Sequence, residues 1–217
     1  MKRSLAIRAN TLLGALALAL PMWSHAAPVD DAVVALQHDW ESIRYQAPAK
    51  EREKRFETLS AKAHEASTLY AGRSEPLVWE GIILSSWAAE RGGLGALSLV
   101  KQARSLYEKA IDIDGKALDG SAYASLGVLY HKVPGWPIGF GDKAKAEALI
   151  KQALALNPNG IDPNFFYADL LADTGRAEQA MPYLERALAA PARPGRELAD
   201  AGRRDEVKAL MARLNAR

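Results

Sequence analysis

The chain has 217 residues, of which 49% are hydrophobic and 25% are charged, and its formal net charge is +2. This length and composition are typical of one globular domain with a substantial core. The sequence contains no cysteine, which excludes disulfides, thiolate metal ligands, a thiol nucleophile and a lipid anchor attached to a cysteine.

The first 26 residues have the pattern of a secretory signal peptide. Lys2, Arg3 and Arg8 form a basic start. An apolar run over residues 12–20 follows, and small residues lead up to Ala26. The apolar run is shorter than the roughly 20 residues that span a bilayer. We therefore expect cleavage after Ala26 and export to the periplasm, with no membrane span in the product.

Removing this leader changes the charge of the chain. The leader holds three of the 28 basic residues and none of the 26 acidic ones, so the rest of the chain has a net charge of about −1. Because this balance implies no basic face, we expect no nucleic-acid partner.

Residues 27–73 are predicted to form a pair of helices. Apolar residues at spacings of three and four run from Val33 to Ile43 and mark one helix face. After a break at Ala47-Pro48, a second amphipathic segment covers residues 51–70. Neither segment matches a known repeat closely, so the pair is either a degenerate repeat or an N-terminal cap.

An internal repeat follows. The spacing Ala-x3-large-x2-Ala occurs three times, beginning at Ala103, Ala146 and Ala180. The last two copies lie 34 residues apart, which is the period of the tetratricopeptide (TPR) repeat, and the first two lie 43 apart. The run Tyr123-x2-Leu-Gly-x2-Tyr130 matches the first-helix signature of the same repeat.

These spacings predict an all-α, TPR-like solenoid over residues 27–217, with helix pairs at 74–115, 116–160 and 161–192. A last helix within 193–217 should cap the stack, because each unit buries its apolar face only against its neighbours. In the first unit, the glycines within 91–95 predict a turn that is longer than usual. In the third unit, Asp162 is a plausible N-cap, followed by Pro163 in the first turn.

The segment 133–142 is a loop inserted between the two helices of the middle unit. Seven of the nine extra residues between the first two repeats fall within this hairpin. Two prolines and three glycines restrict its shape, and it carries Trp136 and Phe140. Two interpretations remain open: the rings fold back and pack on the helices, or they bind a partner.

The sequence offers no set of catalytic residues. His131 has no neighbouring His or Cys, and neither HExxH nor GxSxG spacing occurs. Asp169 and Asp173 share a helix face, which is commonly a solvated stripe. We therefore expect a protein that is not an enzyme and has no metal site and no cofactor.

The first helix of each TPR unit usually lines the concave binding face. This phase places Val128, His131 and Lys132 of the middle unit on that face, together with Phe165 and Asp169 of the third. Such a lining suits an apolar or mildly anionic ligand, with Lys132 as counter-charge. The alternative is that Val128 and Phe165 complete the core and that Lys132 is solvated.

The run 121–142, with its Val-Pro-Gly-Trp-Pro-Ile-Gly-Phe-Gly-Asp end, resembles the T component of tripartite ATP-independent periplasmic (TRAP) transporters. So do the runs 155–167 and 191–196 and the Asp-x-Gly-Arg-Arg motif that ends at Arg204. The resemblance covers roughly residues 75 to 210. It implies a periplasmic TPR scaffold, a possible homotrimer with an apolar pore or cleft, and contact with a solute-binding subunit. Similar proteins are often lipoproteins, from which this cysteine-free chain departs.

Two functions follow as hypotheses. The first is a non-enzymatic periplasmic scaffold that binds a transporter solute-binding subunit and a small hydrophobic or organic-acid ligand. The second is a TPR adaptor in cell-envelope assembly that binds peptide segments of other proteins. The candidate binding residues are Val128, His131, Lys132, Trp136, Phe140, Phe165 and Asp169.

Overall fold

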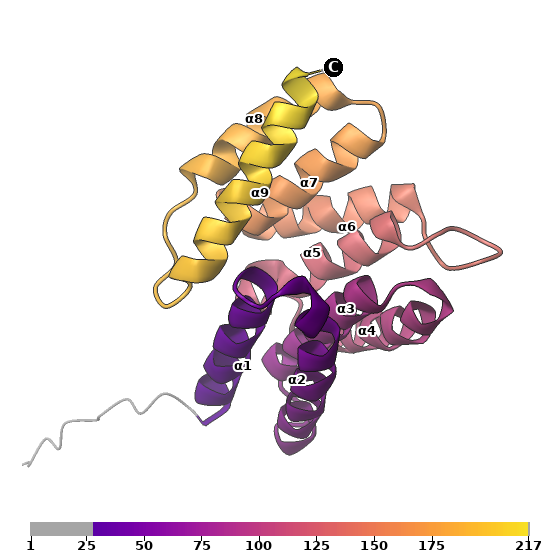
Figure 1. Cartoon of the computed structure of the whole chain (residues 1–217), viewed down its shortest axis with the longest axis vertical. Helices are drawn as coiled ribbons and strands as arrows, with labels where there is room; N and C mark the ends of the chain where they lie inside the picture. Colours follow the sequence, from indigo (N-terminus) through magenta and orange to yellow (C-terminus); the bar gives the residue numbers. More distant parts are fainter. Residues whose placement is uncertain (1–27, 217) are drawn as a thin grey trace, which may run out of the picture.

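The computed structural model describes residues 28–216, and all regular structure in this range is helical (Figure 1). The signal-peptide prediction lies outside the described residues. In chain order the helices are α1 (Pro28–Tyr45), α2 (Ala49–Leu69), α3 (Ser74–Arg91), α4 (Gly93–Asp114), α5 (Ala117–Lys132), α6 (Lys143–Leu156), α7 (Ile161–Asp173), α8 (Ala177–Ala189) and α9 (Glu197–Asn215).

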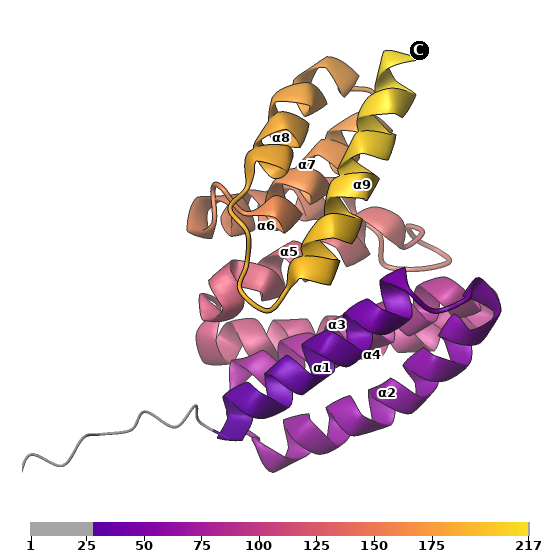
Figure 2. The same cartoon turned by 60° about the vertical axis from the view of Figure 1, so that its left-hand side comes forward.

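The helices form an α-solenoid, as the sequence predicts. Helix α3 packs most extensively on α4, α5 on α6 and α7 on α8, and each pair stacks on the next along the curved body (Figures 1 and 2). Among the described residues, no helix offers a stretch long and apolar enough to cross a bilayer.

Small residues of the repeat hold the paired helices close together. Ala103, Ala146 and Ala180 are fully buried in one continuous core. Gly127 on α5 is packed still more tightly, because a Cβ atom there would lie 2.6 Å from the Ile150 side chain and 3.1 Å from the carbonyl oxygen of Ala146 on α6. The glycine of the aromatic-x2-Leu-Gly signature thus marks a close approach of the α5 and α6 backbones.

Two local predictions are wrong. The turn between α3 and α4 is a single residue, Gly92, because Gly93 and Gly95 are taken up by the first turn of α4. Asp162 is not the N-cap of α7. Gly160 holds that position, and Asp162 lies in the first turn with its carboxylate turned to other elements.

The last helix does more than cap the stack. Val207 and Leu210 of α9 are buried against the third repeat, in line with the expected cap. Helix α9 also contacts α1, which lies at the other end of the chain (Figure 2). The solenoid therefore closes on itself through α1 and α9, so that its concave side becomes a partly enclosed space.

We expect Gly127→Val to destabilise the protein by about 1–3 kcal/mol, the usual effect of overpacking a well-filled core. The added methyl groups would collide with Ile150 and with the α6 backbone. Urea denaturation followed by circular dichroism measures the change.

Ala61→Val is the matched control, since Ala61 is exposed on α2. This substitution should lower the free energy of unfolding by only about 0.5 kcal/mol, because valine has a lower helix propensity than alanine. Equal losses in the two variants would contradict the proposed close contact.

Candidate functional site

The concave side of the solenoid holds a partly open cavity of about 550 Å³. Its walls come mainly from α1, α3, α5, α7 and α9 and from the segment before α9. The larger apolar side chains of the lining are Trp40, Trp79, Ile82, Leu118, Val128, Leu129, Ile161 and Phe166. Of the sequence-predicted site residues, Val128 therefore lines the cavity, while Phe166 takes the place expected for its neighbour Phe165.

The polar part of the lining is cationic and hydroxylic. Four arginines contribute, from α1, from the segment before α9 and from α9 itself. They are Arg44, Arg193, Arg196 and Arg203. Serine hydroxyls of α3 and α5 lie among the apolar walls at positions 85, 86, 121 and 125. The guanidinium groups can bind a ligand through their positive charge and by donating hydrogen bonds, and the hydroxyl groups can bind it through hydrogen bonds.

Asp162 lies at the centre of the ion pairs that hold α9 and the segment before it against α7. Its carboxylate accepts hydrogen bonds from Arg193 at 2.7 Å and from Arg203 at 2.8 Å. Arg193 also bonds to Asp200 at 2.7 Å, and Arg203 bonds to Glu206. Burial acts to raise the pKa of Asp162, but the positive charges of Arg203 and Arg193 outweigh it and lower the pKa below its usual 3.8.

A second set of contacts joins the two chain ends directly. Arg44 of α1 donates to Glu206 of α9 at 2.9 Å. Gly202 lies flat against Tyr45, because a Cβ atom there would be 2.3 Å from the tyrosine ring. A side chain at position 202 would therefore push α9 away from α1.

Arg196 is the cation with the least charge compensation in the cavity wall. It donates to Glu41 at 3.2 Å and lies over the ring of Trp79, 5.1 Å from the centroid. Burial and the nearby charge of Arg193 lower the pKa of Arg196 below its usual range, in spite of the bond to Glu41. An additional anion beside this guanidinium would be stabilised.

Three other predicted residues meet away from the cavity. His131 is buried at the C-terminal end of α5, and Asp169 and Asp173 on α7 face it. Lys132 bridges the two carboxylates at 2.6 and 2.8 Å. The two aspartates are therefore not the solvated stripe expected from the sequence, and none of these four residues is part of the cavity wall. Phe165 packs under the guanidinium of Arg203 at 4.8 Å.

The two aromatic rings of the 133–142 loop have different environments. Phe140 packs edge-on against Tyr130, with centroids 5.4 Å apart, and under the guanidinium of Arg104 at 4.7 Å. Trp136 is 90% exposed, and Ile138 beside it is 64% exposed. The loop projects from the body between α5 and α6 (Figure 1).

Backbone contacts hold this loop in one shape. Asp142 donates from its N–H to the Tyr130 carbonyl, and Gly141 donates to the Pro134 carbonyl, both at 2.9 Å. Gly141 cannot carry a side chain, because a Cβ atom would lie 1.9 Å from the Val133 oxygen. The side chain of Asp142 then caps α6 by accepting from two backbone N–H groups.

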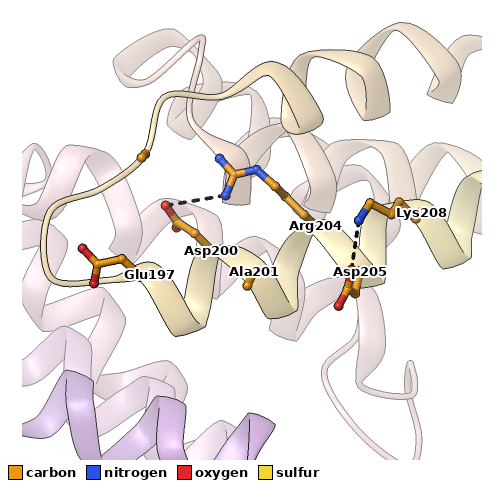
Figure 3. A pocket seen from close by; sticks show the side chains of 7 residues that line it. Glu197, Asp200, Ala201, Arg204, Asp205 and Lys208 are labelled. Atoms are coloured by element: carbon orange, nitrogen blue, oxygen red, sulfur yellow. Dashed lines mark hydrogen bonds and ion pairs between the residues drawn. The ribbon is translucent and has the colours of Figure 1, made fainter.

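A smaller hollow of about 350 Å³ lies beside the start of α9 (Figure 3). Four of its five charged side chains are paired among themselves, Asp200 with Arg204 at 3.9 Å and Asp205 with Lys208 at 3.1 Å, and the fifth, Glu197, accepts from the backbone N–H of Gly195. Because these charges already have partners, the central cavity is the stronger candidate for a binding site.

Asp162→Asn should lower the free energy of unfolding at pH 7 by about 2 kcal/mol or more. Removing one partner of a buried pair costs about 3–5 kcal/mol, and the partial exposure of Asp162 reduces this value. Because the folded pKa is depressed, this stability is present above the unfolded pKa and is lost as the pH falls through the folded pKa. The difference between the two proteins should therefore shrink below about pH 4, which urea titrations at several pH values measure.

Asp205→Asn is the control, because Asp205 is exposed and pairs only with Lys208. It should change the stability by less than about 1 kcal/mol. A similar loss in both variants would show that Asp162 does not close the ring.

The tetratricopeptide-repeat family model matches residues 161–192, which contain α7 and α8. No significant match is found among curated proteins. The crystal structure of MamA superposes with a TM-score of 0.45 at 18% identity, covering 79% of this chain and 95% of that chain. The crystal structure of TTC0263, a thermophilic TPR protein in Thermus thermophilus, superposes with a TM-score of 0.41 at 16% identity, covering 83% and 99%. The family match shows one TPR repeat, formed by α7 and α8, and the pairs α3–α4 and α5–α6 have the same paired-helix packing.

Proposed function

We propose that the protein is a non-enzymatic periplasmic TPR scaffold that holds a small, mainly apolar organic acid in its central cavity. We further propose that the 133–142 loop contacts a protein partner, the solute-binding subunit of a TRAP-type transporter. The partner is suggested by the resemblance of residues 121–142 to the T component of these transporters. The observation that most supports the proposal is the central cavity.

The size and lining of the cavity support a small ligand. Its volume of about 550 Å³ lies within the roughly 300–1,000 Å³ typical of small-molecule pockets, which are mostly apolar with a few polar groups that fix orientation. Trp40, Trp79 and Phe166 supply the apolar surface. Serine hydroxyls and guanidinium groups supply the polar contacts.

Charge favours a ligand with a carboxylate. Arg193 and Arg203 are occupied by Asp162 and its neighbours, whereas Arg196 has one carboxylate partner, Glu41. A guanidinium group binds a carboxylate in a bidentate manner. An organic acid would therefore place its carboxylate at Arg196 and its apolar part toward Val128.

The closed ring argues against the alternative of a peptide adaptor. An extended peptide needs a groove that is open along the solenoid. Here α9 contacts α1, and the ion pair of Arg44 with Glu206 joins the two ends. The remaining space suits a compact ligand better than an extended chain.

The loop supports a protein contact. Trp136 is held away from the helices on a hairpin whose base is fixed by Phe140 and by backbone hydrogen bonds. Tryptophan is enriched among the residues that dominate binding energy at interfaces. Because the loop that presents the exposed tryptophan is already held in one shape, it loses little conformational entropy on binding, and this reduces the entropic cost of forming the complex.

Val128→Trp should abolish ligand binding, because the indole would fill the part of the cavity that faces the apolar walls. Native mass spectrometry of the gently purified protein should show a bound organic acid in the wild type and none in the variant. Val34→Trp is the matched control, since Val34 is 47% exposed on α1 and should leave the bound mass unchanged. An identical bound mass in both variants, or none in the wild type, would contradict the proposal, and a peptide mass would favour the adaptor.

Trp136→Ala should weaken capture of the co-encoded solute-binding subunit by about tenfold or more, the range of an interface hot spot. Crosslinking and affinity measurements with the purified subunit test this. Leu94→Ala is the control, since Leu94 is 87% exposed at the start of α4. Absence of any complex, or equal weakening by both substitutions, would refute the proposed partner contact while leaving the cavity untouched.

A further inference from the structure

We propose that His131, Asp169 and Asp173 form a binding site for one divalent transition-metal ion, with zinc as the best fit, between the second and third repeats. This site is separate from the cavity and from the 133–142 loop contact, and it does not depend on the proposed function. The sequence shows no metal-ligand spacing here because the ligands come from two helices that the fold brings together.

The geometry suits one ion. Asp169 and Asp173 lie one turn apart on α7, so both carboxylates face the same side. Opposite them, at the C-terminal end of α5, the Nε2 atom of His131 lies 3.2 Å from Oδ2 of Asp173. One ligand atom from each residue lies within 4.8 Å of the others. Zinc bonds to imidazole nitrogen and carboxylate oxygen are about 2.0–2.2 Å long, so small side-chain adjustments would place one ion in contact with all three.

The state of His131 is a second, independent indication of a ligand. Its side chain is only 1% exposed, and its Nε2 atom is buried and makes no hydrogen bond, although Oδ2 of Asp173 lies 3.2 Å away. A buried polar atom without a partner costs about 1–3 kcal/mol. Bonding to a metal ion would remove this cost.

A cation already occupies the space between the carboxylates. The Nζ atom of Lys132 lies 2.6 Å from Asp169 and 2.8 Å from Asp173. Its side chain is 48% exposed, so it can turn out to solvent when an ion enters. Arg213 of α9 is the other nearby positive charge, 3.9 Å from each aspartate. The site therefore attracts cations, and Lys132 is the competitor that a metal ion must displace.

The location gives the site a structural consequence. His131 precedes the loop by two residues, and the Nζ atom of Lys143, just after the loop, donates to the His131 carbonyl at 2.7 Å. An ion that joins α5 to α7 would therefore also fix the base of the loop that presents Trp136.

Titration of the tag-free protein with Zn²⁺ in a calorimeter, and with Co²⁺ followed by its visible spectrum, tests the site. We expect one ion per chain in the wild type. His131→Gln should weaken binding by about 100-fold, at or beyond the loss typical of outer-shell partners. Lys132→Gln should strengthen binding by about tenfold, because the ion then no longer breaks two half-exposed ion pairs.

His64→Gln is the matched control, because His64 also pairs with a carboxylate, Glu80 at 2.9 Å, but lies outside the three-residue group. It should leave the affinity unchanged. Circular dichroism checks that His131→Gln is folded, and Lys132→Gln keeps the test decisive if it is not. Failure of wild type and Lys132→Gln to bind either ion, or equal affinity of Lys132→Gln and wild type, would overturn the proposal.

Discussion

The carboxylate of Asp162 is held between the guanidinium groups of Arg193 and Arg203, and this contact ties α9 and the segment before it to α7, in the position from which α9 also contacts α1. One arginine lies on the segment before α9 and the other on α9 itself, so a single acidic side chain at the start of α7 ties down both. Charge-assisted hydrogen bonds of this kind are about twice as strong as neutral ones. Asp200 and Glu206 compensate the remaining positive charge, which limits the cost of burying the cluster.

Closure changes what a TPR-type solenoid can bind. An open array presents an extended concave surface, whereas here the contact of α9 with α1 turns that surface into a cavity of about 550 Å³. The aromatic walls then lie in a recess that is partly shielded from solvent, where a polar contact is stronger than at the open surface. Arg196 lies within this space, and its depressed pKa reflects the same environment.

The local spacing of residues in the sequence predicted the repeats, but it could not predict that α9 contacts α1. Ala103, Ala146 and Ala180 are fully buried because each packs against helices nearby in sequence, so their spacing encodes the contact. The bond from Arg44 to Glu206 joins residues 162 positions apart, and nothing in either neighbourhood marks it. Asp162 was misassigned for a related reason: an aspartate beside a proline at a helix start usually caps the helix, and only the distant arginines give it another partner.

Helix α5 connects the three features that the structure brings to light. Val128 faces the cavity, His131 one turn later faces the aspartates of α7, and the loop with Trp136 begins directly after the helix ends. An α-helix rises about 1.5 Å per residue, so the three features lie within a short length of one helix and its end. Gly127 fixes α5 to α6 by close backbone contact and Phe140 fixes the loop to Tyr130. One helix therefore supplies a wall of the cavity, the histidine that faces α7 and the support of the loop that presents Trp136.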